Sequence, residues 1–120
     1  MMMTAGSREE AARLADILVV ARLAACVQIL PEIESVYHWK DKVERAPEIL
    51  LLAKTTQENF VSLEAAVRSL HSYETPEIIA LPITEASAPY LEWLTANVLP
   101  QSKETQQATA ANANGSTQSA

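Results

Sequence analysis

Cysteine and glycine are scarce in the 120-residue chain, which holds one cysteine, Cys26, and two glycines. A single cysteine excludes a disulfide within the chain, and the sequence begins without a signal-peptide pattern, so we expect a reducing, cytoplasmic location. Two isolated glycines exclude the glycine-rich loops that bind phosphate groups. Spacings typical of zinc sites, such as Cys-x-x-Cys or His-x-x-His, are also lacking. We therefore expect no required cofactor.

Long hydrophobic runs and an excess of positive charge are lacking as well. Apolar runs such as residues 49–53 are far shorter than the ~20 residues that cross a bilayer, so we expect no membrane partner. Nine basic residues stand against 15 acidic ones, for a net charge of −6, and an acidic surface repels phosphate backbones. We expect no nucleic-acid partner. No motif places a base beside a serine or cysteine nucleophile, so nothing predicts an enzyme.

Composition divides the chain into a body and a tail. Residues 101–120 consist mostly of Ala, Ser, Thr, Gln and Asn and contain no large apolar side chain to bury. We expect this polar tail to be disordered. Residues 1–100 carry the apolar side chains and are long enough for one small domain.

Three helices are predicted by capping residues and by apolar spacing. Ser7 and Glu10 have the spacing of a capping box, which predicts a helix from residue 8 to about residue 22. A second helix follows Thr55 and Thr56 and ends near His71. Ser87 is a suitable cap for a short last helix.

Strands are predicted between these helices. Residues 26–39 form a long strand in which Pro31 marks a bulge, residues 40–42 form a hairpin tip, and the chain returns along residues 43–55. The run 49–53 implies burial on both faces, either inside the sheet or beneath another subunit. Residues 77–83 form a further strand, and residues 1–5 supply a short first strand. The fold class is therefore α+β, a β-α-β-β-α-β sandwich with a truncated first strand and an extra C-terminal helix.

Several side chains are candidates for a site, each with an ordinary structural alternative. Cys26 is either a buried apolar residue or a soft metal ligand, and His71 either complements a helix C-terminus or binds a metal or an anion. Tyr37 and Trp39 flank a polar hairpin tip, where they either pack against another subunit or line a small-molecule site. Lys54 is a solvated lysine or an anion-binding or interface charge.

In order along the chain, these residues resemble the CutA divalent-cation-tolerance family. The specific segments are Arg22-Leu23-Ala24-Ala25-Cys26-Val27, Ser35-Val36-Tyr37-His38-Trp39, Lys54-Thr55, His71-Ser72-Tyr73-Glu74-Thr75-Pro76-Glu77 and Tyr90-Leu91-Glu92-Trp93-Leu94. The resemblance implies a ferredoxin-like subunit, a homotrimer held by long hairpins and a role in tolerance to copper and other divalent ions without enzymatic activity. The family pattern has glycine at the hairpin turn, where this chain has Asp41.

The resemblance also implies a site. His71, Glu77 and Cys26 match the family's candidate metal ligands, while Tyr37, Trp39, Lys54 and Tyr73 match cleft or interface positions. We therefore expect a cytoplasmic homotrimer that binds a divalent ion such as Cu(II). The alternatives are a signalling trimer similar to the PII family, which binds a small anionic effector between subunits, and a structural trimer that anchors a partner.

Overall fold

The computed structural model describes residues 1–100, and the predicted disordered tail lies outside these described residues. Along the chain the elements are β1 (Met2–Ala5), α1 (Arg8–Val20), β2 (Cys26–Trp39), β3 (Lys42–Lys54), a short 3₁₀ turn (Gln57–Asn59), α2 (Phe60–Leu70), β4 (Ile78–Ile79) and α3 (Ala88–Ala96). This order confirms the predicted β-α-β-β-α-β arrangement with an extra C-terminal helix. None of the helices in this part of the chain is long and apolar enough to span a membrane.

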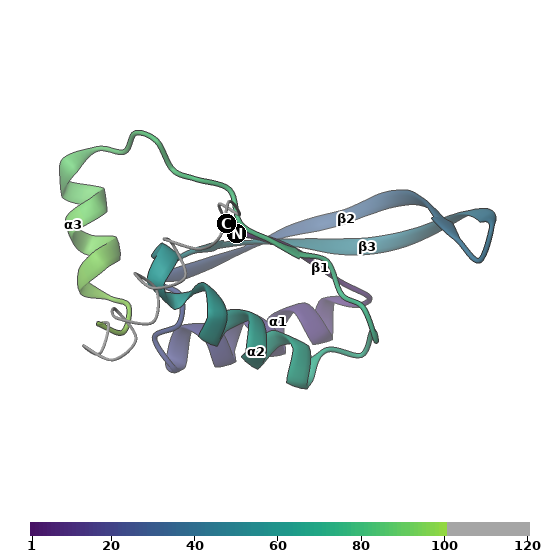
Figure 1. Cartoon of the computed structure of the whole chain (residues 1–120), viewed down its shortest axis with the longest axis horizontal. Coiled ribbons are helices and arrows are strands. Elements are labelled where there is room, and N and C mark those ends of the chain that lie inside the picture. Colours follow the sequence, from purple (N-terminus) through teal and green to yellow (C-terminus); the bar gives the residue numbers. More distant parts are fainter. Residues whose placement is uncertain (101–120) are drawn as a thin grey trace, which may run out of the picture.

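The four strands form one antiparallel sheet in the order β2-β3-β1-β4, and α1 and α2 lie together along one face of it (Figure 1). The core lies between that face and the two helices. Its fully buried large side chains are Met3, Leu14, Leu18, Leu51, Leu63 and Val67. At one end of the sheet, Leu94 of α3 and Val98 just after this helix pack against Ala25, and at the other end the β2–β3 hairpin projects beyond the helices (Figure 1).

Local signals in the sequence explain where α1 begins and ends. The Glu10 backbone N–H donates to Ser7 Oγ at 3.1 Å, as the predicted capping box requires. The helix ends at Val20, and Arg22 then takes a left-handed conformation with φ of 59°. The helix is therefore two residues shorter than the sequence suggested, because this left-handed residue reverses the chain toward β2.

The hairpin contains the predicted bulge. Pairing runs regularly from Cys26↔Lys54 to Leu30↔Leu50 and resumes at Ile33↔Glu48, so β2 has one extra residue at this point. Successive strand residues alternate between faces, and the extra residue therefore reverses the phase of β2 beyond Pro31. At the tip, Lys40 and Asp41 both have positive φ, of 50° and 63°.

The last strand is shorter than predicted. Residues 77–83 were expected to form it, but only Ile78–Ile79 pair, opposite Met3 and Met2. Continuing this register places residue 80 opposite Met1, and within residues 1–100 no strand is paired with residues 81–83. A cavity of about 400 Å³, the sheet-end cavity, lies at this position and is lined by Met1, Ala53, Thr55, Leu81 and Ile83 among others.

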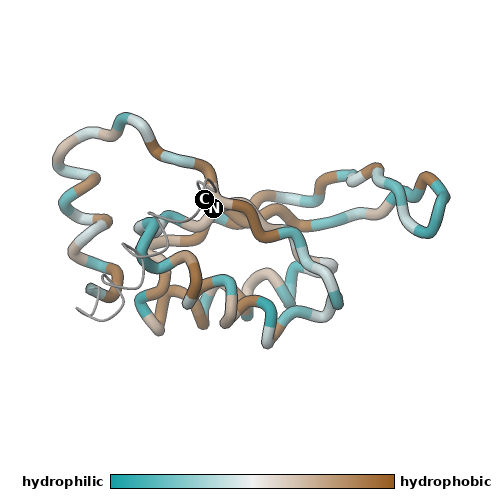
Figure 2. Tube along the Cα trace, in the orientation of Figure 1, coloured by the Kyte–Doolittle hydropathy of each residue, from teal (hydrophilic) through white to brown (hydrophobic). Residues whose placement is uncertain are grey.

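The face of β3 that points away from the helices is also apolar. Ile49, Leu51 and Ala53 are buried toward the helices, whereas Leu50 and Leu52 on the other face are half-buried. Leu30 pairs with Leu50 and is half-buried as well. The hydropathy of the chain is correspondingly high along this central part of the sheet and mixed toward the hairpin tip (Figure 2). The predicted burial of run 49–53 is therefore confirmed on the face toward the helices, whereas the other face is only half-buried in one chain, and its covering by another subunit stays a prediction.

Candidate functional site

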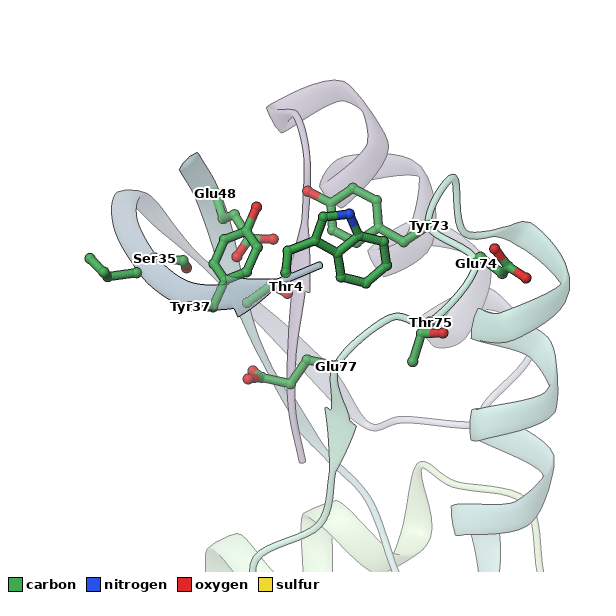
Figure 3. A pocket seen from close by; sticks show the side chains of 10 residues that line it. Thr4, Ser35, Tyr37, Glu48, Tyr73, Glu74, Thr75 and Glu77 are labelled. Atoms are coloured by element: carbon green, nitrogen blue, oxygen red, sulfur yellow. The ribbon is translucent and has the colours of Figure 1, made fainter. Parts of the chain in front are cut away.

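A cavity of about 570 Å³ lies between the β2–β3 hairpin and the segment that follows α2. Three aromatic residues line it, Tyr37, Trp39 and Tyr73, together with three acidic residues, Glu48, Glu74 and Glu77. The remaining lining residues are Thr4, Ser35, Val36 and Thr75, so no basic side chain borders this hairpin cavity. Four of the seven residues predicted for a site, Tyr37, Trp39, Tyr73 and Glu77, therefore meet around one space (Figure 3).

The bulge places Tyr37 and Trp39 on the face of the hairpin that borders the hairpin cavity. Beyond it, Ile33 pairs with Glu48, and the alternation puts Ser35, Tyr37 and Trp39 on the face that carries Glu48. A regular strand would have placed Tyr37 and Trp39 on the opposite face. In the structure the Tyr37 ring lies beside Glu48, and Tyr73 approaches from the other side (Figure 3).

Tyr73 is held by contacts along its whole side chain. Its ring lies 4.7 Å from the His71 ring, centroid to centroid, and its hydroxyl donates to the Glu48 carboxylate. Burial, this hydrogen bond and the negative charges of Glu48 and Glu10 raise the pKa of Tyr73 to about 12. A Cβ at Gly6 would lie 3.0 Å from the hydroxyl oxygen, so the absence of a side chain at Gly6 makes room for the phenol.

Glu10 holds the start of the segment that carries Tyr73. One carboxylate oxygen accepts from the Ser72 backbone N–H at 2.9 Å, and the other accepts from the Ser72 hydroxyl at 3.0 Å and the Gly6 N–H at 3.2 Å. Burial alone would raise the pKa of Glu10, but the hydrogen bonds from Ser72 and Gly6 and the nearby His71 outweigh it and lower that pKa. Glu10 thus joins the start of α1 to the loop after α2.

Both ring nitrogens of His71 take part in hydrogen bonds within the chain. Nδ1 accepts from the Tyr73 backbone N–H at 3.0 Å, which leaves the proton on Nε2, and Nε2 donates to the Thr4 carbonyl at 2.7 Å. The imidazole therefore connects the loop to β1. A metal ion at either nitrogen would replace one of these hydrogen bonds.

Cys26 and Lys54 lie together but far along the sheet from the hairpin cavity. They are paired opposite each other at the ends of β2 and β3. The half-buried Cys26 thiol lies 3.7 Å from the Tyr90 hydroxyl, and Lys54 Nζ donates to the side chain of Gln28. The three predicted metal ligands, His71, Glu77 and Cys26, are thus not gathered at one point of the chain. Among residues 1–100, no three His, Cys, Asp or Glu side chains are placed to hold one metal ion.

Sequence reasoning missed Glu48 and the second role of Glu10. Glu48 faces the hairpin cavity because of the bulge, and counting residues across that bulge would have indicated its position. Glu10 was identified as a capping residue, yet its contacts with Ser72 span 62 residues of sequence. No local pattern signals a contact over such a distance.

Relatives and solved structures are similar to the described part of the chain. The Divalent-cation tolerance protein CutA of Thermus thermophilus is 47% identical over 96 residues, which cover 80% of this chain and 93% of that protein. The chloroplastic Protein CutA of Arabidopsis thaliana is 50% identical over 76% of this chain, but this chain spans only half of its length. The crystal structure of CutA1 from Oryza sativa superposes with a TM-score of 0.82 at 41% identity and covers 83% of this chain and 92% of that one.

The match to the family description agrees with these relatives. Residues 1–97 match the family described as CutA1 divalent ion tolerance protein, which includes every element of the sheet and all three helices. The fold is accordingly ferredoxin-like, as the solved structures show. The chain belongs to the CutA1 divalent ion tolerance family.

Proposed function

We propose that the chain is a non-enzymatic, cytoplasmic homotrimer that binds Cu(II) or another divalent cation weakly, as part of metal tolerance. Its family membership supports the class of ion, since relatives carry the name divalent-cation tolerance protein. The observation that carries the proposal is the loop after α2, which presents the His71 imidazole and the carboxylates of Glu74 and Glu77 within seven residues. Imidazole and carboxylate are suitable donors for Cu(II).

The contacts of His71 explain why binding should be weak. One ring hydrogen bond must be given up for a metal bond, and the carboxylates of one subunit do not converge with the imidazole. The ligand set is then completed by movement of the loop or by groups of a neighbouring subunit. Cys26 contributes only if its half-buried thiol is accessible to the ion, because Cu(II) prefers imidazole and carboxylate donors and thiolate favours Cu(I).

The structure gives less support to an anionic effector. Lys54, the residue that favoured this alternative, donates to Gln28 away from the hairpin cavity, and the cavity is lined by carboxylates. An anion in that space would meet three negative side chains without a basic partner among the lining residues. A cation is therefore the better match.

A titration of the full chain with Cu(II), followed by electron paramagnetic resonance, tests the proposal. We expect nitrogen coupling from one imidazole, and a loss of affinity of at least about tenfold in His71→Ala, with a smaller loss in Glu77→Gln. His38→Ala is the matched control, because His38 lies exposed on the hairpin. Affinity should also fall on acidification, since protons compete for the imidazole. Unchanged Cu(II) affinity in His71→Ala would show that the loop is not the site.

A further inference from the structure

The imidazole of His71 has to leave its present contacts before it can bind a cation. Its Nδ1 lone pair accepts from the Tyr73 N–H at 3.0 Å, and its Nε2 carries the proton that is donated to the Thr4 carbonyl at 2.7 Å. A ligand that binds only a released form of a protein has an affinity reduced by the fraction of molecules in that form. Whatever stabilises the engaged arrangement of His71 therefore lowers the affinity for the ion.

Glu10 acts on the residue between the two loop positions involved. Ser72 follows His71 and precedes Tyr73, and it donates to the Glu10 carboxylate from its backbone N–H at 2.9 Å and from its hydroxyl at 3.0 Å. The Gly6 N–H donates to the same carboxylate at 3.2 Å, which fixes the carboxylate at the start of α1. Hydrogen bonds to an ionised acceptor are stronger than neutral ones. The position of Ser72, and with it the contact of His71 with Tyr73, therefore depends on Glu10.

The contact between Glu10 and Ser72, here called the clamp, does not involve the surfaces that the proposed trimer would bury. Its partners lie at the end of β1, at the start of α1 and directly after α2, all within one chain. The helix α1 covers the face of the sheet opposite the one that carries Leu50 and Leu52 (Figure 1). Assembly through that apolar face and through the hairpin leaves these hydrogen bonds in place.

We propose that Glu10 is a positioning residue of the cation site, which clamps Ser72, keeps the His71 imidazole engaged with Thr4 and Tyr73, and so limits the affinity for divalent cations. The inference rests on the proposed metal function, because it concerns access to the same imidazole. Glu10 does not bind the ion. The weakness of binding is then set by the clamp, and weakening the clamp makes binding tighter.

Two variants of the full chain test the clamp without changing the net charge. Glu10→Asp keeps the carboxylate but shortens its side chain by one methylene, and Ser72→Ala removes the hydroxyl donor. We expect each to raise the Cu(II) affinity about threefold to tenfold, with an unchanged mass by light scattering. Ser69→Ala is the matched control, because the Ser69 hydroxyl donates to the Ala66 carbonyl within α2. Unchanged or weaker Cu(II) binding in both clamp variants would overturn the proposal.

Amide hydrogen exchange, followed by nuclear magnetic resonance without metal, separates this inference from the metal function. In Glu10→Asp the amides of Ser72 and Tyr73 should exchange at least about tenfold faster, while the His71 amide, which donates to Val67 at the end of α2, should not change. Equal acceleration of all three amides, or no acceleration, would refute the clamp whatever the result with Cu(II). If the exchange responds as expected but neither the original chain nor the variants bind Cu(II), the metal function is refuted and the clamp remains as the restraint on His71.

Discussion

At the scale of single residues, Glu10 joins the start of α1 to the loop after α2. It is 4% exposed, and its carboxylate receives three hydrogen bonds from Gly6 and Ser72. Hydrogen bonds to a charged acceptor contribute more than neutral ones, because the charge strengthens each of them. The loop that bears both His71 and Tyr73 is therefore positioned by a residue that is not one of the proposed ligands.

Glu10→Gln should destabilise the fold by about 1–3 kcal/mol near neutral pH, since it removes the charge and leaves a donor where acceptors are needed. The pKa of Glu10 is lowered in the folded state, so its contribution is complete above the unfolded pKa of about 4.3 and disappears as the pH falls through the lower folded pKa. Urea unfolding from pH 7 to pH 3 measures both effects.

The neighbouring Glu9→Gln is the control for this experiment, because Glu9 lies exposed in the same first turn of α1. It should unfold like the original chain at each pH. If Glu10→Gln kept the full acid dependence of the original chain, the pairing of Glu10 with Ser72 would not be the source of that dependence.

At the scale of elements, the hairpin tip stores strain in two residues. Lys40 and Asp41 both have positive φ, a combination typical of a type I′ turn, in which the second position favours glycine. The left-handed conformation costs a residue with a Cβ about 1–2 kcal/mol. Glycine avoids this steric cost but loses more backbone entropy on folding, so the net gain from glycine is smaller than that cost.

Asp41→Gly should therefore raise the free energy of unfolding by up to about 1 kcal/mol. Denaturant unfolding measures it, and Asp41→Ala separates the effect of the backbone from that of the lost charge. If Asp41→Ala stabilised the fold as much as Asp41→Gly does, the gain would come from the lost charge and not from the backbone conformation.

The end of the sheet near Met1 offers a second test at this scale. The Met1 amine donates to the Ala53 carbonyl, and burial, together with the charge of Lys54, lowers the pKa of this amine. A fused extension of about six to eight alternating β-branched residues would replace the half-buried charge and enter the sheet-end cavity beside residues 81–83.

This extension should raise the melting temperature by several degrees, because 1 kcal/mol shifts a domain of this size by about 4–8 °C. Scanning calorimetry compares it with a Gly/Ser extension of equal length, which removes the terminal charge but has little tendency to form a strand. Identical melting of the two extended chains would show that no strand is added at this end.

At the scale of the whole molecule, one apolar face of the sheet is incompletely covered. Leu30, Leu50 and Leu52 are half-buried on the face opposite α1 and α2, and Tyr37 and Trp39 are exposed on the same face of the projecting hairpin. An apolar surface of this kind is typical of an association interface. The proposed trimer would bury it against two further copies.

Light scattering should give the mass of three chains at micromolar concentration. Leu30→Glu places a charge on the apolar face at an edge strand and should shift the assembly toward monomer while circular dichroism stays unchanged. Val61→Glu is the matched control, since Val61 is 73% exposed on α2, away from this face. A folded monomer of the original chain would contradict the trimer.

The sequence alone determined the order of the elements, the bulge at Pro31, the cap of α1 and the family. These features depend on local signals: apolar periodicity, a proline that cannot donate and capping side chains. It also identified Tyr37, Trp39, Tyr73 and Glu77, which do meet at one cavity.

Tertiary structure decided the rest. It shortened the last strand to Ile78–Ile79, because a strand exists only where its neighbour offers backbone partners. It separated Cys26 and Lys54 from His71, and it engaged both nitrogens of His71 with Thr4 and Tyr73. Such contacts join segments many residues apart. They depend on the packing of the whole chain, and a local pattern of residue types does not predict them.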